Sequence, residues 1–213
     1  ASWSSLNSHD IPVAAISVLE FISDELPLAS FRFAPGRGPM PAPDDFSRAP
    51  EAPLFALLDQ LGIRTATITH PMVFTVAESQ NVKAHLPGGH TKNLFMKDKS
   101  GQLVLVCALG SSTLPLNQLH RALGCQRLSF TDAPLLWDAL GVTPGSVTGF
   151  AVMNDTAGRV RLVAEEALLA HDILNFHPLR CDMTTAISRA DFLGFAVATG
   201  HTVTPVDFTK LAA

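Results

Sequence analysis

A cation and an amide that follow a glycine pair are the residues of this sequence best suited to chemistry. Residues 87–95 read PGGHTKNLF, in which the cation is Lys92 and the amide is Asn93. Glycine lets the backbone approach a ligand closely, and the apolar run from Leu94 predicts a buried strand that anchors polar groups on a loop. The same spacing also fits a glycine turn before an ordinary strand with solvated lysines, and this alternative stays open.

The lysines of the chain are concentrated around this segment. Four of the five, Lys83, Lys92, Lys97 and Lys99, fall within seventeen residues, although the formal net charge of the chain is −4. A local positive field favours an anionic ligand such as a phosphate, even in a mildly acidic protein. We therefore predict that this region binds an anion.

Two further segments carry polar groups in patterns that suit a binding site. Residues 141–145 read GVTPG and precede Ser146. This loop either presents backbone N–H groups to an oxyanion or a water, or is a tight connection between a helix and a strand. Residues 176–185 read FHPLRCDMTT and combine an imidazole, a guanidinium and two hydroxyls. In the alternative interpretation, a threonine caps the next helix and Arg180 pairs with a surface carboxylate.

Metal and thiol chemistry are disfavoured by spacing. His85, His90, His177 and Asp182 could assemble a metal site, but no HExxH motif or Cys/His pairing occurs. Cys181 follows His177 by four residues, yet no third group is evident that would orient the pair, and cysteine is often simply a small buried residue. We expect no metal ion and no other cofactor.

The composition is that of a chain that folds around an apolar core. Its 213 residues are 47% hydrophobic and 16% charged, with a mean hydropathy of +0.25, which excludes a disordered chain. No apolar run is long enough to span a bilayer. Three cysteines without CxxC spacing favour a reducing compartment, and the first 30 residues lack the features of a secretory signal. We expect a cytoplasmic protein with no membrane partner.

The distribution of proline divides the chain near residue 50. Eight of the fifteen prolines lie in the first 53 residues, and residues 33–53 have the composition of a linker or an arm. Apolar positions after Asp10 predict a short helix within this part. We expect an N-terminal extension at residues 1–51 and one domain at residues 52–213.

The domain mixes helices with strands and hairpin turns. We expect helices over residues 52–61, 75–84, 115–123, 132–140, 164–171 and 189–199, and strands over residues 63–70, 93–97, 102–108, 147–153 and 159–163. Turns are expected at residues 98–101 and at residues 154–158, where turn chemistry explains Asp155 better than catalysis does. This order predicts an α+β fold without the regularity of a doubly wound sheet.

Taken together, five segments resemble one protein family in their order and spacing. They are His70-Pro71 with Phe74-Thr75, residues 88–95 (GGHTKNLF), residues 141–147 (GVTPGSV), the Asn154-Asp155 turn and residues 176–185. Over about residues 52–210 the chain resembles the YbaK/prolyl-tRNA synthetase-associated editing domains, and within them the free-standing branch that removes alanine from mischarged tRNA(Pro). The resemblance implies a twisted mixed β-sheet surrounded by helices, and hydrolysis of an aminoacyl ester.

The resemblance implies roles for individual residues. Lys92 matches the lysine that contacts the terminal phosphate or helps to place the ester, and Asn93 matches the residue that orients the aminoacyl group. His177 matches the histidine that lines the amino-acid pocket, and Gly145 matches the glycine of the loop that closes over the ester. Many relatives have a proline four residues after that glycine, where this chain has Gly149.

The remaining site residues form two expected sets. Cys181 stands where asparagine is common, so a polar role at that position is in question. The expected substrate-binding residues are Thr75, Gly89, His90, Ser146 and Arg180. The expected tRNA-binding residues are Lys83, Lys97 and Lys99.

Ester hydrolysis agrees with this inventory, because an aminoacyl ester is already activated. Positioning of a water, stabilisation of the oxyanion and help from the 2′-hydroxyl of the substrate would suffice without a serine or cysteine nucleophile. A small pocket would admit alanine and exclude proline. We expect the acceptor end of tRNA(Pro) as the partner, prolyl-tRNA synthetase as a further one, and no DNA. The alternatives are a deacylase for cysteine or serine, and a catalytically silent tRNA-binding module.

Overall fold

The computed structural model describes residues 37–71 and 86–211, all within one compact unit, Phe33–Ala213. The helix expected after Asp10 and the helix expected over residues 75–84 lie outside the described residues. Within the described ranges, no helix is both long enough and apolar enough to cross a membrane.

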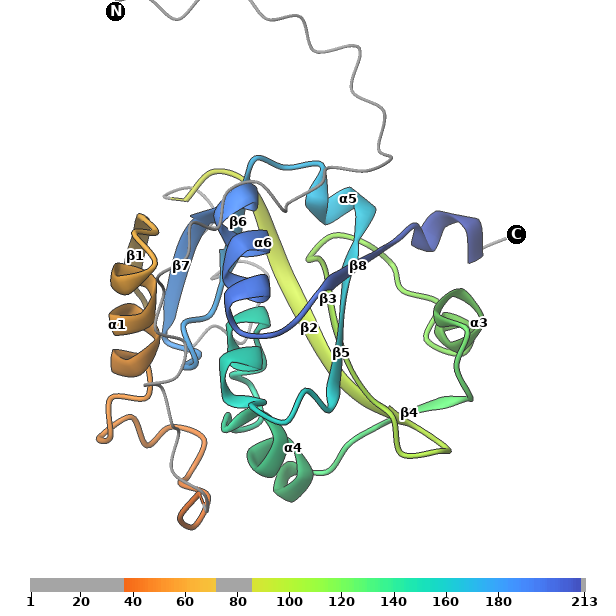
Figure 1. Ribbon diagram of the computed structural model, residues 1–213, viewed down its shortest axis with the longest axis horizontal. Helices are drawn as coiled ribbons and strands as arrows, with labels where there is room; N and C mark the ends of the chain where they lie inside the picture. Colours follow the sequence, from red (N-terminus) through yellow and green to blue (C-terminus); the bar gives the residue numbers. More distant parts are fainter. Residues whose placement is uncertain (1–36, 72–85, 212–213) are drawn as a thin grey trace, which may run out of the picture. The chain divides into compact units, whose positions relative to one another are not determined.

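A mixed sheet of eight strands forms the framework of the domain (Figure 1). The strands are β1 (Thr65–Thr69), β2 (Gly89–Asp98), β3 (Leu103–Leu109), β4 (Leu128–Phe130), β5 (Val160–Glu165), β6 (Ile173–Phe176), β7 (Met183–Ser188) and β8 (Val203–Val206). Their order is β1-β7-β6-β2-β3-β5-β8, and β4 pairs with the end of β2. The β2–β6, β3–β5 and β5–β8 pairs are parallel, and the others are antiparallel. The prediction of an α+β fold built on a mixed sheet is confirmed.

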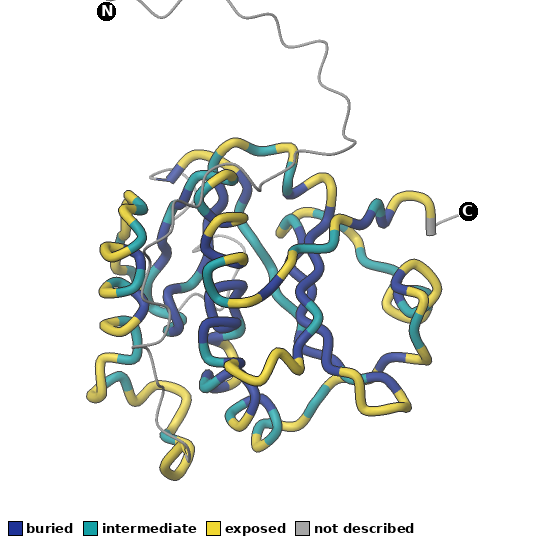
Figure 2. Tube along the Cα trace, in the orientation of Figure 1, coloured by how far each residue is buried: buried dark blue, intermediate teal, exposed yellow. Residues whose placement is uncertain are grey.

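Helices pack against both faces of this sheet. They are α1 (Ala52–Gln60), α3 (Leu119–Leu123), α4 (Ala133–Leu140), α5 (Glu166–Leu169) and α6 (Arg189–Ala198), with the 3₁₀ helices η3 (Gly149–Asn154) and η4 (Phe208–Leu211). One buried cluster joins Leu105 and Cys107 to α1, α4, η3 and α6, and another joins Val104 and Val106 to α3 and η4. Because successive strand residues point to opposite faces, β3 is buried on both sides (Figure 2). We call these sides of the sheet the α6 face and the α3 face.

Four phenylalanines form the centre of the core on the α6 face. The ring of Phe176 stacks on that of Phe192 with centroids 4.6 Å apart, and Phe150 meets Phe195 edge-on at 5.4 Å. A Cβ atom on Gly149 would lie 2.9 Å from the Phe192 ring, so only glycine lets η3 approach this closely. The phenylalanine cluster therefore gives a steric reason for a glycine at position 149.

The prediction of a strand over residues 147–153 is wrong. Thr148 caps η3 by accepting a hydrogen bond from the Phe150 N–H at 3.3 Å, and residues 149–153 are all buried. A short apolar run that is buried on every side has no polar face to reveal its period. Its pattern therefore fits a strand as well as a helix.

Most of the other predicted elements are confirmed. α1, α4 and α6, and β1, β3 and β5, fall at the expected positions, and the turn after Asp98 closes the β2–β3 hairpin. The helices expected over residues 115–123 and 164–171 are shorter than predicted, the latter because Ala164 extends β5 by pairing with Cys107. Four strands, β4, β6, β7 and β8, were not predicted, and β4, β6 and β8 are only three or four residues long.

The glycine pair before Lys92 lies at the boundary between a loop and a strand, and Gly88 precedes the strand with the positive φ of +112. β2 begins at Gly89 because Gly89 and His90 pair with Leu174 and Asn175 of β6. Lys92 therefore lies well inside a strand that is paired with β3 along most of its length.

Residues 37–51, which we expected to belong to a linker, are attached to the domain. Arg37 donates a hydrogen bond to the Asn154 carbonyl at 2.7 Å, and the Trp137 indole donates to the Gly38 carbonyl at 3.0 Å. At the other end of the segment, Glu51 accepts a hydrogen bond from Arg180.

Candidate active site

Lys92 lies on the α3 face of the sheet. Lys92, Leu94 and Met96 are every second residue of β2 and point to the same face, where Leu94 and Met96 pack in one cluster with α3. The ammonium group of Lys92 donates a hydrogen bond to the Ser112 carbonyl. Both the strand and this hydrogen bond restrict the side chain. Lys92 is therefore a held cation rather than a freely solvated one.

Asn93 leaves the strand from the opposite, α6 face. It lies opposite Cys107 in the β2–β3 ladder, and its Nδ2 donates to Thr91 Oγ1 at 3.2 Å. Its Oδ1 is buried and has no hydrogen-bond partner among the described residues. An unpaired buried acceptor costs free energy, which is typical of groups that meet a ligand.

The strand registers place further polar residues on the face of Lys92. His90 lies opposite Asn175 of β6, and Asn175 lies opposite Ala186 of β7. Residues that lie opposite each other in neighbouring strands point to the same face, so His90, Asn175 and Ala186 share one face. Lys92 is two residues from His90, and Thr184 is two residues from Ala186. Because the side-chain period of a strand is two, Lys92 and Thr184 both point to this face, the α3 face.

His177 directly follows β6 and is held by one ring nitrogen. Nδ1 lies 2.7 Å from the Met183 carbonyl, which can only accept, so in the neutral ring Nδ1 carries the proton and Nε2 is an acceptor. Burial lowers the pKa of His177 below its usual value, and the hydrogen bond to Met183 offsets this only in part. No described residue forms a hydrogen bond to Nε2. The neutral ring therefore offers an acceptor to a water or a substrate.

His70 and Thr184 complete this cluster and were absent from the predicted site. The His70 ring lies 6.3 Å from that of His177, and its Nε2 is 2.9 Å from Thr184 Oγ1. His70 Nδ1 lies 2.8 Å from the Pro71 carbonyl, so Nε2 of the neutral ring accepts from the threonine hydroxyl. The signal for His70 was present in the His70-Pro71 segment of the resemblance.

Gly145 and Ser146 are the last two residues of a tight turn that begins at Thr143. The Ser146 N–H donates to the Thr143 carbonyl at 3.0 Å, and Gly145 has φ +93, which a turn with Pro144 at its second position requires. This N–H is therefore already paired. Ser146 Oγ is fully buried, with no partner in the part of the chain that the structure describes. In that same part, no hydrogen bond or ion pair joins these two residues to Lys92, Asn93 or His177.

Gly89 and His90 begin β2. A Cβ atom on Gly89 would lie 2.9 Å from the His171 ring, so this glycine allows close packing between β2 and the end of α5. His90 Nε2 lies 2.8 Å from the Leu86 carbonyl. Thr75 and Lys83 lie outside the described residues.

Arg180 is occupied by protein carboxylates. It donates to both carboxylate oxygens of Asp182, at 2.6 and 2.7 Å, and to Glu51 at 2.9 Å. Hydrogen bonds from Arg180 lower the pKa of Asp182 and, in return, raise the pKa of Arg180. The alternative of a pairing with carboxylates, left open by the sequence, is what the structure contains.

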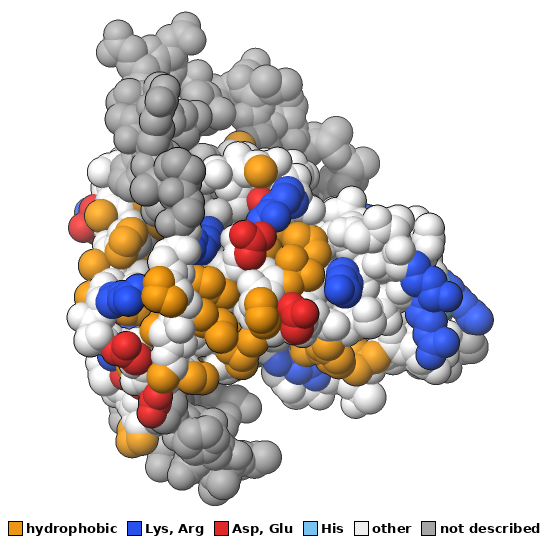
Figure 3. Space-filling model, turned by 90° about the horizontal axis from the view of Figure 1, so that it is seen from below, with side chains coloured by type: hydrophobic (Ala, Val, Ile, Leu, Met, Phe, Trp, Pro, Cys, Tyr) orange, Lys and Arg blue, Asp and Glu red, His pale blue; other side chains and the backbone are white. Residues whose placement is uncertain are grey.

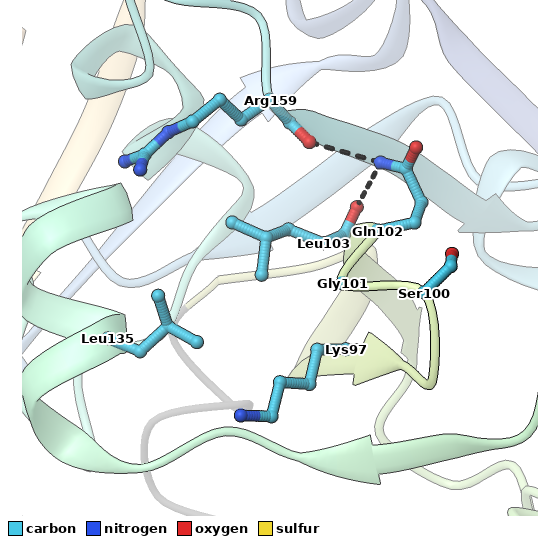
Figure 4. Close-up of a pocket in the computed structure, with 7 residues that line it drawn as sticks. All are labelled: Lys97, Ser100, Gly101, Gln102, Leu103, Leu135 and Arg159. Atoms are coloured by element: carbon cyan, nitrogen blue, oxygen red, sulfur yellow. Dashed lines mark hydrogen bonds between the residues drawn. The ribbon is translucent and has the colours of Figure 1, made fainter.

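Lys97 lines an open hollow of about 590 Å³ at the far end of β2 (Figure 4). The other lining residues are Ser100, Gly101, Gln102, Leu103, Leu135 and Arg159. Lys97 lies five positions after Lys92 along the strand, a span of about 17 Å. The hollow is therefore distinct from the His177 cluster.

This end of the molecule is basic. Lys99, Arg121 and Arg127 are exposed there, whereas Asp98 is buried and accepts hydrogen bonds from Ser100. Figure 3 shows Lys and Arg side chains without Asp or Glu among them at the right-hand end, where Figure 1 has α3 and the β2–β3 hairpin. The region suits contact with phosphates.

The described residues contain no group of three or more His, Cys, Asp or Glu side chains that could hold a metal ion. Cys107 is fully buried, which raises the pKa of its thiol and keeps it protonated. The available chemistry is a held cation, a neutral imidazole acceptor and nearby hydroxyls. Such a set can bind an anion and position a water, without a covalent nucleophile.

The fold and this site define a class of domains in which a mixed sheet carries a lysine and a histidine on one face. A family model described as "Aminoacyl-tRNA editing domain" matches residues 70–195, more than half of the chain. The protein belongs to the aminoacyl-tRNA editing domain family.

Named relatives support this membership. The chain is 39% identical over 153 residues to "Prolyl-tRNA synthetase associated domain-containing protein 1" of Danio rerio, covering 71% of this chain and 83% of that protein. It is 30% identical over 155 residues to "Prolyl-tRNA editing protein ProX" of Acetoanaerobium sticklandii, covering 72% of this chain and 94% of that protein.

A solved structure supports the fold. It is described as a proposed trans-editing enzyme for prolyl tRNA synthetase, and it covers 74% of this chain and 96% of its own with a TM-score of 0.59. At 16% sequence identity, this likeness concerns the fold alone.

Proposed function

We propose that this protein is an aminoacyl-tRNA deacylase that hydrolyses Ala-tRNA(Pro). The observation that carries the proposal is the neutral His177 ring, whose Nε2 is available on the sheet face that also holds Lys92. The name of the ProX relative, a prolyl-tRNA editing protein, supports tRNA(Pro) as the substrate. The KNLF form of the lysine motif favours alanine as the edited residue.

In the proposed reaction, water attacks the acyl carbon of the ester. The bond between that carbon and the ribose oxygen breaks, the ribose oxygen takes a proton, and free alanine leaves tRNA(Pro) with an intact 3′ end. His177 Nε2 accepts a hydrogen bond from the water or from the amino group of the alanine. Lys92 binds the phosphate of the terminal nucleotide. The orienting role expected for Asn93 is left out of this scheme, because its side chain leaves β2 from the α6 face, opposite to Lys92. No step in this scheme uses a metal ion.

The remaining groups have supporting roles in the proposal. Gly145 and Ser146 belong to a loop near the ester, and Lys97 and Lys99 contact the RNA backbone. The editing domain spans residues 52–213 and acts in the cytoplasm, with prolyl-tRNA synthetase as the source of mischarged tRNA(Pro).

The test is deacylation of tRNA(Pro) charged with alanine, cysteine, serine or proline, with and without EDTA. We expect rapid loss of alanine, slow loss of the others, and no effect of EDTA. Preference for cysteine or serine would reassign the substrate. No turnover of any ester, with tRNA still bound, would make the protein a tRNA-binding module. Loss of turnover with EDTA and its recovery with zinc would overturn the metal-free scheme.

A further inference from the structure

Arg180 connects the turn that carries His177 to the segment before α1. Its Nε and Nη2 form a bidentate pair with Asp182, its Nη1 donates to Glu51, and its guanidinium lies 4.4 Å above the Phe46 ring. The planar fork of arginine suits several such partners at once. The exposed fractions of the Arg180, Asp182 and Glu51 side chains are only 17%, 19% and 15%, so solvent screens these contacts less than at an open surface.

The turn held by Arg180 has an uncommon backbone. Leu179 has φ +67, in the left-handed region that residues other than glycine rarely adopt, and its side chain is buried. Backbone strain of this kind persists only where the surrounding structure determines it. Arg180 is the next residue along the chain, so its contacts act directly on the strained position.

The same turn fixes both histidines of the site cluster. The Asp182 carbonyl accepts a hydrogen bond from the His70 N–H at 2.9 Å, and the next carbonyl, that of Met183, accepts from His177 Nδ1. The backbone at residues 182 and 183 therefore orients the His177 ring and fixes the backbone of His70. The bidentate pair with Arg180 holds this backbone against the rest of the turn.

Arg180 bonds to Glu51 at the C-terminal end of residues 37–51, and the N-terminal end of this segment is also attached to the domain. The Arg37 guanidinium covers Gly141 so closely that a Cβ atom there would lie 2.7 Å from Arg37 Cζ. Arg37 also donates to Asn154, and Trp137 donates to Gly38. The segment is therefore fixed on the domain before it reaches Phe46 and Glu51.

We propose that Arg180 is a positioning residue for His177 and that residues 37–51 complete its support. The affected reaction is the deacylation proposed above, so the catalytic part of the inference rests on that function. Residues 37–51 lie before residues 70–195, the part of the chain that the family model matches. The support thus extends the functional unit of this protein beyond the matched region.

The proposal has a consequence for the His177 ring that does not depend on a substrate. Burial is the main cause of its low pKa, and the other titratable groups that act on it are His70 and Asp182. If the turn loosens, water reaches the ring and its pKa rises toward the usual value.

The test compares Arg180→Lys and Glu51→Gln with the control Asp172→Asn. Lysine keeps the charge of Arg180 but loses the bidentate fork, and Glu51→Gln weakens only the link to residues 37–51. Asp172 pairs with Arg189 at 3.4 Å, and its side chain is 92% exposed, so its change to Asn removes a carboxylate away from the support. The full chain is measured by thermal unfolding, by NMR titration of the His177 ring, and by kcat and KM for Ala-tRNA(Pro).

We expect a higher pKa for His177 in both variants, with the larger shift in Arg180→Lys. We also expect kcat to fall by about 10- to 100-fold with little change in KM, because a displacement near 1 Å has effects of that size. Asp172→Asn should match the wild type in every measurement.

An unchanged His177 titration in folded Arg180→Lys would overturn the positioning role. A rise in KM alone with that unchanged titration would return Arg180 to direct substrate binding. If Arg180→Lys does not fold, an unchanged titration in Glu51→Gln overturns the role of residues 37–51. A shifted titration in a protein whose wild type has no deacylase activity would support the positioning role and refute the proposed function.

Discussion

Two histidines of this protein, His177 and His201, are both near carboxylates but use their ring nitrogens differently. His201 Nε2 lies 3.2 Å from Asp155 Oδ2, and its Nδ1 lies 2.9 Å from the Thr199 carbonyl. His177 has one such partner, the Met183 carbonyl. His201 therefore has a complete set of hydrogen bonds, and His177 has an incomplete one within the described chain.

This difference in hydrogen bonding gives His201 a structural role and leaves His177 available for chemistry. Asp155 also accepts a hydrogen bond from the Val160 N–H at 2.7 Å, so the His201–Asp155 pair connects the start of β5 to a residue two positions before β8. Both ring nitrogens of His201 are taken up by acceptors of the protein, so neither is left for a ligand. His177 keeps a lone pair for a ligand, because its pKa is low and no residue in the described ranges bonds to its Nε2.

The largest effect on activity should come from His177, the histidine with the incomplete set of hydrogen bonds. His177→Ala removes the Nε2 acceptor, and we expect deacylation of Ala-tRNA(Pro) to fall by about 100- to 10,000-fold, as for the loss of a general acid or base. The unfolding temperature should change little. Near-normal turnover by a folded variant would remove His177 from the mechanism.

Lys92 should be nearly as important. In Lys92→Ala the strand remains paired, so the domain should fold while deacylation is largely lost. Lys92→Arg should restore little activity, because a planar fork does not replace a compact ammonium at the same position. Single-turnover kinetics on the folded variants would measure both effects, and full activity of Lys92→Ala would contradict the assigned role.

His201→Ala should have the opposite profile. It leaves the buried Asp155 carboxylate without its imidazole partner, for which we expect a loss of about 3 kcal/mol in the free energy of unfolding. Urea denaturation would measure this loss, with activity per folded molecule retained. A stable but inactive His201→Ala protein would contradict the structural role assigned to His201.

Acid should affect the two regions in different pH ranges. Protonation of His177 removes its acceptor, so activity should fall only below the usual histidine value, since burial lowers its pKa. Burial raises the pKa of Asp155, but hydrogen bonds from His201 and Val160 outweigh this and bring it below its usual value.

The stabilisation from Asp155 is therefore complete above the unfolded value, about 4, and is lost as the pH falls through the lower folded value. A pH–rate profile beside denaturation curves would show activity lost first. Loss of both at one pH would mean that unfolding alone causes the decline.

The sequence predicted much of this arrangement where the signals were local. Glycine ends of helices, the hairpin after Asp98 and the continuous apolar run of β3 each follow from a few neighbouring residues, and each is present. Residues 149–153 were misassigned because complete burial removes the polar face that distinguishes helix from strand.

The partners of the candidate site could not be predicted in the same way. The contact of Arg180 with Glu51 and the approach of His70 to Thr184 join residues more than 110 positions apart. The resemblance selected Lys92 and His177, but only the registers of β2, β6 and β7 show that Lys92 and Thr184 share a sheet face and that Asn93 leaves it. Tertiary contacts of this kind leave no periodic signal.

The smallest effect should come from the basic end of the molecule, away from the His177 cluster. Lys97 lines the hollow and Lys99 is exposed on the hairpin turn, so each can contact one phosphate of a bound tRNA. Each phosphate contact releases counterions, and its loss should flatten the slope of log affinity against log salt by about one unit or less.

Affinity across a salt series would be compared for the wild type, Lys97→Ala/Lys99→Ala, and the control Lys210→Ala, whose exposed lysine pairs with Asp207. We expect a flatter slope only in the double variant, with kcat unchanged because His177 is untouched. An unchanged slope would move the tRNA footprint away from the β2–β3 hairpin and leave the basic end without a role in binding.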